Sequence, residues 1–127
     1  METLTVNLFV KDINRSIAFY KQLGFEIVMS VPEQGDLVWA MINCGGVNIM
    51  LQTIASMGDE LPDIDRTQTS GSLIFYIKLK QIRNFFGQIK DRVEVVKGLE
   101  KTFYGATEFT IKDADGFHLT FAEDEPA

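Results

Sequence analysis

The chain has 127 residues, 46% of them hydrophobic and 24% charged, which is enough for one globular domain over residues 1–127 but too short for two independent ones. Its net charge of −6 argues against a nucleic-acid partner, because affinity for a phosphate backbone comes from clustered lysines and arginines. A single cysteine, Cys44, rules out an intramolecular disulfide, and with no leader-like or membrane-spanning apolar run in sight we expect a cytoplasmic protein without a membrane partner.

The first half of the chain predicts one strand, one helix and three further strands. Residues 4–10 alternate as a strand does, Asp12 stands where a helix N-cap belongs, and Gly24 is placed to end that helix. Short strands follow at residues 25–30, 37–42 and 47–52, with turns at 32–36 and 43–46. Module one, about residues 1–53, therefore reads βαβββ.

The second half repeats this order after a linker, residues 54–71, that shows no clear periodicity. Residues 72–79 predict a strand, 80–93 a helix, and 93–96 a strand that a break at 98–102 ends. The last part predicts a β-hairpin, strands 108–112 and 117–121, whose turn is built from Asp113, Ala114, Asp115 and Gly116. Module two, about residues 72–127, is again βαβββ.

The two halves also match residue by residue. Residues from Thr5 align with those from Ser72, an offset of 67, and residues from Cys44 align with those from Ala114, an offset of 70. A duplicated βαβββ unit predicts an α+β fold in which two four-stranded mixed sheets, each with one helix packed on it, enclose a concave cleft. We expect a ligand to bind in that cleft.

Two motifs resemble the vicinal oxygen chelate superfamily, which includes glyoxalase I, extradiol dioxygenases and bleomycin-resistance proteins. They are Val10-x-Asp12 followed by SIAFYKQLGFE at residues 16–26, and YGATEFTIKDADGFHLTF at residues 104–121. The nearest resemblance is to the bleomycin-resistance-like branch. It implies a small homodimer that binds an organic ligand without a metal or other cofactor, as in the sequestration of an antibiotic or a toxin.

In metal-dependent members, the resemblance implies up to four ligands, usually His, Glu or Gln. The matching positions here are Thr5, Met50, Ser72 and Thr120. None of these side chains is an imidazole or a carboxylate, so no metal site is expected at them. The alternative is a metal-dependent lyase, isomerase or dioxygenase whose ligands are displaced to His118, Glu108 or Glu123.

Trp39 and Tyr104 match aromatic positions of the bleomycin-resistance-like branch, where two rings can hold a flat ligand between them. The offset of 70 points Trp39 toward the helix, whereas a slip of one residue in the turn at 43–46 points it into the cleft. The other residues expected to bind ligand are Met50, Gln52, Ser72, Tyr76, Glu108 and Thr120. Glu108 is the one carboxylate expected to face inward, as an acid or base, as the partner of a cationic ligand, or in a salt bridge at the rim. No constellation of a nucleophilic hydrolase is present, and the expectation leans away from an enzyme.

Overall fold

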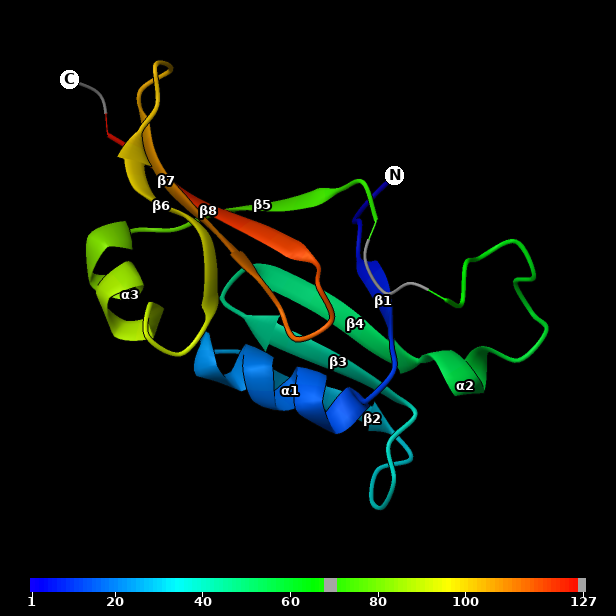
Figure 1. The fold of residues 1–127 in the computed structure, drawn as a ribbon. Helices are drawn as coiled ribbons and strands as arrows, with labels where there is room; N and C mark the ends of the chain where they lie inside the picture. Colours follow the sequence, from blue (N-terminus) through cyan, green and yellow to red (C-terminus); the bar gives the residue numbers. More distant parts are fainter. Residues whose placement is uncertain (68–70, 126–127) are drawn as a thin grey trace. The chain divides into compact units, whose positions relative to one another are not determined.

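The computed structural model describes residues 1–67 and 71–125, which fall into two compact units (Figure 1). Unit 1 lies within Met1–Thr69 and unit 2 within Ser70–Ala127. Unit 1 contains β1 (Val6–Val10), α1 (Ile13–Gln22), β2 (Glu26–Val31), β3 (Trp39–Cys44), β4 (Val47–Thr53) and α2 (Ile54–Met57). Unit 2 contains β5 (Ile74–Lys78), α3 (Ile82–Ile89), β6 (Glu94–Lys101), β7 (Ala106–Lys112) and β8 (His118–Asp124). The predicted α+β class with two βαβββ modules is confirmed.

The sheet of unit 1 has the strand order β1-β4-β3-β2, with β1 and β4 parallel and the other pairs antiparallel. One face is covered by α1 (Figure 1) and buries Leu8, Ala40 and Leu51. The helix begins as predicted, because the Asp12 carboxylate accepts a hydrogen bond from the Arg15 amide at 3.2 Å. The helix ends at Gln22 with Leu23 as its C-cap, one residue before the expected Gly24. Gly24 follows directly, with a φ of +104° that glycine adopts without strain.

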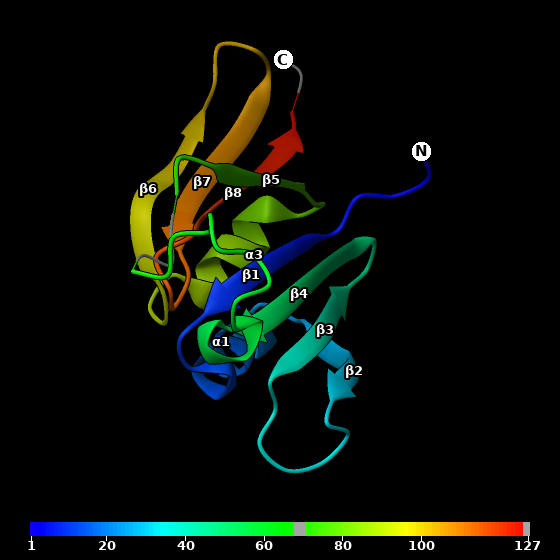
Figure 2. The same ribbon diagram turned by 90° about the vertical axis from the view of Figure 1, so that its right-hand side faces the viewer.

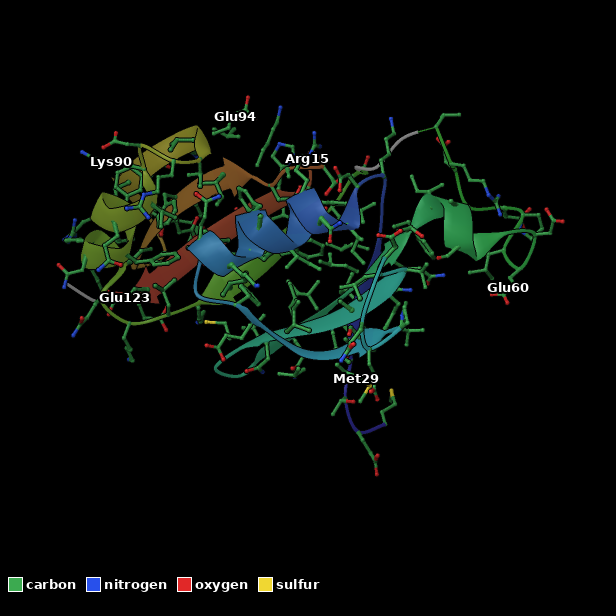
Figure 3. The ribbon with its side chains drawn as sticks, turned by 90° about the horizontal axis from the view of Figure 1, so that it is seen from below. Arg15, Met29, Glu60, Lys90, Glu94 and Glu123 are labelled. Carbon is green, nitrogen blue, oxygen red and sulfur yellow. The ribbon has the colours of Figure 1, made fainter. Side chains whose placement is uncertain are left out.

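The sheet of unit 2 repeats the arrangement in the order β5-β8-β7-β6. Its covered face is aromatic: the ring of Phe86 lies 4.9 Å from Phe109, and the ring of Phe85 lies 5.1 Å from Phe121. Figure 3 labels Glu123, whose Oε1 accepts a hydrogen bond from the Ile82 amide at 2.9 Å. A carboxylate from β8 thus satisfies one of the free amides at the start of α3.

The closing hairpin of unit 2 has the turn that its sequence predicts. Oδ1 of Asp113 accepts hydrogen bonds from the amides of Asp115 and Phe117, both at 2.9 Å. Gly116 has a φ of +91°, which explains the glycine at this position. The turn sets the register in which β7 and β8 pair.

Two predictions about secondary structure were wrong. The segment 54–71 begins with α2, which Thr53 caps by accepting a hydrogen bond from the Ser56 amide at 3.2 Å. A helix of four residues is too short to show a helical period. In unit 2, the expected break at 98–102 does not end the strand, because β6 continues to Lys101 with shifts in register on either side of Lys97.

The two units do not correspond at a single offset. Asn7 pairs with Met50 in unit 1, and Tyr76 pairs with Thr120 in unit 2. If Met50 and Thr120 are equivalent, at an offset of 70, then Asn7 is equivalent to Tyr76 and the first strands correspond at 69 rather than 67. Because the difference is even, each side chain still lies on the face that the sequence predicts. None of the helices within residues 1–67 and 71–125 has the length and hydropathy needed to cross a bilayer.

Candidate functional site

Unit 1 has an open sheet face on the side away from α1, which we call the Trp39 face. Trp39 pairs with Gln52 and Met41 pairs with Met50, so these side chains point the same way while their neighbours Ala40 and Leu51 point into the core. The face also carries Phe9, Asn7, Met29 and Val31, of which Met29 is labelled in Figure 3. This face therefore carries rings, thioethers and amides, and its side chains are not part of the hydrophobic core.

The orientation of Trp39 follows from the length of one turn. Two glycines, Gly45 and Gly46, separate the paired residues Cys44 and Val47, whereas residues 113–117 separate the paired Lys112 and His118 in unit 2. The shorter turn slips β3 by one residue, so that Trp39, opposite Gln52, is equivalent to Glu108, opposite Ala122. Trp39 consequently turns away from the helix, which is one of the two orientations that the sequence leaves open.

A chain of hydrogen bonds runs along one side of the Trp39 face. Asn7 Nδ2 donates to Gln52 Oε1 at 2.9 Å, and Gln52 Nε2 donates to Ser56 Oγ at 3.3 Å. Ser56 Oγ in turn donates to the carbonyl oxygen of Thr53 at 2.9 Å. Sequence reasoning missed Asn7 as a site residue, although an amide on the uncovered face of β1 is the signal that points to it.

Unit 2 brings three of the predicted residues together in what we call the Glu108 cluster. The hydroxyls of Tyr76 and Tyr104 both donate to Oε2 of Glu108, at 2.5 Å and 2.6 Å. The carboxylate raises the pKa of both phenols, mainly because it accepts their protons in hydrogen bonds and also because it repels a phenolate. The two phenols therefore remain protonated donors. The sequence left several roles open for Glu108, but it did not predict that two tyrosines would be its hydrogen-bond partners.

The Glu108 cluster borders a hollow of about 310 Å³ at the β6–β7 hairpin. Figure 2 shows this hairpin at the end of the sheet. Phe103 at the hairpin tip is 99% exposed and packs edge-on against the ring of Tyr104, with ring centres 5.1 Å apart. Lys97 and Glu100 form an ion pair of 2.6 Å on the same wall. The lining residues are Lys97, Glu100, Lys101, Thr102, Phe103, Tyr104 and Glu108.

Two predicted residues of unit 2 lie outside this cluster. Thr120 is 6% exposed and its hydroxyl lies 2.8 Å from that of Thr110, so it is occupied within the sheet. Ser72 precedes β5, is exposed, and lines a separate open hollow of about 520 Å³ with His118. Neither residue joins Tyr76, Tyr104 and Glu108 in their shared hydrogen bonds.

The residues present do not fit a catalytic divalent metal. The four positions implied by the resemblance hold hydroxyls and a thioether, and across residues 1–67 and 71–125 no group of three His, Cys, Asp or Glu side chains could hold an ion. The displaced set also fails. Glu123 pairs with Thr107 and caps α3, on the opposite face from Glu108. Glu108 is opposite Ala122, four residues from His118 and hence roughly 13 Å away along the strand.

Comparisons with known proteins agree with this fold. A protein of unknown function from Agrobacterium tumefaciens str. C58 has a TM-score of 0.80 and 22% identity, over 97% of this chain and 94% of that chain. A bleomycin-binding protein crystallised with bleomycin has a TM-score of 0.68 and 22% identity, over 98% and 100% of the two chains. A bleomycin resistance determinant encoded on the transposon Tn5 has a TM-score of 0.68 and 23% identity, over 98% and 99%. At these identities, the likeness shows the fold.

Curated protein sequences contain no significant match to this chain. One family does match over nearly its whole length: the sequence model of the glyoxalase, bleomycin resistance protein and dioxygenase superfamily covers residues 3–121. That span takes in every helix and strand except the last three residues of β8, and it includes every residue of the Trp39 face and the Glu108 cluster. The chain belongs to the Glyoxalase/Bleomycin resistance protein/Dioxygenase superfamily.

Proposed function

We propose that this protein binds a small or medium-sized organic molecule without a divalent metal, and that it sequesters an antibiotic or a toxin. The observation that carries the proposal is the Trp39 face, where one indole ring and two thioethers point away from the core on neighbouring strands. An aromatic ring stacked on Trp39 gains about 0.5 to 1.5 kcal/mol beyond burial. Met41 and Met50 adapt their shape to different ligands because their side chains are unbranched and flexible.

Within unit 2, considered by itself, the Glu108 cluster is suited to a basic group of an organic molecule. Its carboxylate carries negative charge at a surface where Tyr76 and Tyr104 are 49% and 57% exposed. The faces of the two rings attract a cation as well, each by about 0.5 to 1 kcal/mol at an exposed site. The structural relative crystallised with bleomycin makes bleomycin the natural first probe.

We also propose that the protein is a cytoplasmic homodimer. Strand β2 lies at an edge of its sheet and exposes Val28, Met29 and Val31 at 59%, 61% and 51%. Apolar edge strands are normally covered by another element or another chain. Sedimentation velocity would give the mass in solution, and a monomer at micromolar concentration would contradict the dimer.

Fluorescence titration of Trp39, the single tryptophan, tests the binding function. We expect bleomycin or another flat basic compound to quench the emission to saturation and to raise the melting temperature. Met50→Lys places a charge on the Trp39 face and should weaken binding at least about tenfold, since burying an unpaired ammonium costs more than 1.4 kcal/mol. Leu61→Lys is the matched control, because Leu61 is 48% exposed and lies outside the sheets.

Two results would contradict the proposal. One is the absence of quenching and of any thermal shift across a broad library of flat organic compounds. The other is zinc, nickel, manganese or iron retained in near-stoichiometric amount after purification without chelator. That second result would favour a metal-dependent lyase, isomerase or dioxygenase.

A further inference from the structure

The hydrogen-bond chain along the Trp39 face has only one workable direction. The Thr53 carbonyl oxygen can only accept, so the single hydroxyl proton of Ser56 is committed to it at 2.9 Å. Ser56 Oγ must then accept from the amide group of Gln52, which leaves Gln52 Oε1 facing Asn7. If the two amides were reversed, Gln52 Oε1 would face Ser56 Oγ and would need its only proton. The oxygens of Ser56 and Thr53 would then lie 2.9 Å apart with no proton between them.

This direction determines which atom of the Asn7 side chain is left without a partner. Its Nδ2 donates to Gln52 Oε1, so its Oδ1 is the atom that remains. Asn7 Oδ1 is buried and has no hydrogen-bond partner, the one side-chain atom in that condition among residues 1–67 and 71–125. An unpaired buried acceptor costs about 1 to 3 kcal/mol, and native proteins rarely retain one without a function.

We infer that Asn7 Oδ1 selects ligands by accepting a hydrogen bond from an N–H group on a flat, largely apolar ligand. Asn7 pairs with Met50, and Met50 pairs with Met41, so the acceptor lies in the row next to Trp39 and two strands away from it. A planar ligand that touches both therefore has to extend across β4. The oxygen is covered without a ligand, so the groups that cover it have to move when a ligand binds. Gln52 and Ser56 are positioning residues, since they keep the oxygen rather than the NH₂ group of Asn7 available as the unpaired atom. This inference rests on the proposed function and adds the class of ligand: planar molecules with a ring or amide N–H.

Indole and 1-methylindole form a matched pair of probes, because indole has one N–H donor and its methylated form has none. Their binding is measured by NMR titration of the ¹⁵N-labelled protein, following the Trp39 indole and Asn7 side-chain amide signals. We expect indole to bind the wild type about tenfold more tightly, the ratio that corresponds to one satisfied acceptor. The Asn7 amide signals should shift with indole only.

Ser56→Ala separates positioning from contact, since Ser56 stands at the far end of the chain of hydrogen bonds. Without its hydroxyl, both Gln52 and Asn7 can turn over, so the preference for indole should fall to within about twofold. Asn7→Leu should abolish the preference by removing the acceptor. Ser30→Ala is the control, because the Ser30 hydroxyl donates to the Pro32 carbonyl in the same unit and takes no part in the chain. It should keep the wild-type preference.

The outcomes distinguish the two proposals. If both compounds bind the wild type equally, or if Ser56→Ala keeps the full preference, the role of Asn7 is overturned while ligand binding stands. Equal binding is also the result expected if ordered water alone satisfies Asn7 Oδ1. If neither compound shifts any signal of the Trp39 face, ligand binding by that face is overturned and the role of Asn7 with it.

Discussion

Replacing Asp113 with alanine should destabilise the protein strongly, although no helix or strand contains this residue. Its Oδ1 holds the amides of Asp115 and Phe117 at 2.9 Å, and all three residues are less than 10% exposed. Each hydrogen bond to a charged group contributes about 1.5 to 3 kcal/mol, and alanine leaves both donors without it. Since water can reach part of an opened turn, we expect a loss at the lower end, about 3 kcal/mol in the free energy of unfolding.

For a domain of this size, that loss lowers the melting temperature by about 10 °C. The assay is urea and thermal unfolding followed by circular dichroism, with Asp113→Asn as the control because its amide oxygen can still accept both hydrogen bonds. Asp113→Asn should lose less than half as much unfolding free energy as Asp113→Ala loses. An alanine variant within about 0.5 kcal/mol of the wild type, the range of ordinary surface substitutions, would refute the reasoning.

Two further predictions concern unit 2. Glu108→Gln should lower the pKa of Tyr76 and Tyr104 toward the ordinary value of about 10, because a neutral amide neither repels a phenolate nor holds its proton as strongly. Since the folded pKa values lie above the unfolded ones, the stability that these phenols contribute is complete below about pH 10 and is lost as the pH rises further. Tyrosinate absorbance measures the shift, and coincident titrations of variant and wild type would contradict it. Glu123→Ala should cost about 1 kcal/mol in unfolding free energy by removing the cap from the Ile82 amide, whereas Glu123→Gln keeps an acceptor there. Equal stability of the two variants would show that the cap contributes nothing.

Much of the fold was accessible from the sequence because its signals are local. Asp12 and Gly24 mark the two ends of α1 through interactions within one turn of the helix. Asp113 and Gly116 likewise mark the closing turn. The break expected at residues 98–102 was wrong for a related reason. Gly98 permits a bulge as readily as a turn, and pairing with β7 continues the strand to Lys101.

The candidate site was only partly accessible. Glu108 was expected to face inward, and it does lie on the open face of its sheet, but its partners Tyr76 and Tyr104 come from β5 and from the hairpin tip. A pattern of alternation shows which face a residue occupies and says nothing of which strand lies beside it. Asn7 was missed because its importance depends on Gln52 and Ser56, more than forty residues away.

By itself, the sequence determined the chemistry of each sheet face. Successive side chains of a strand point to opposite sides, so the alternation alone separates the core from the rings, thioethers and hydroxyls. The family resemblance supplies the metal-ligand positions, and the sequence shows that they carry no imidazole or carboxylate. Only the tertiary structure decided which of these groups meet. Strand register depends on turn length and on pairing between distant segments, and a turn of two glycines, shorter than its counterpart in unit 2, is what directs Trp39 away from α1.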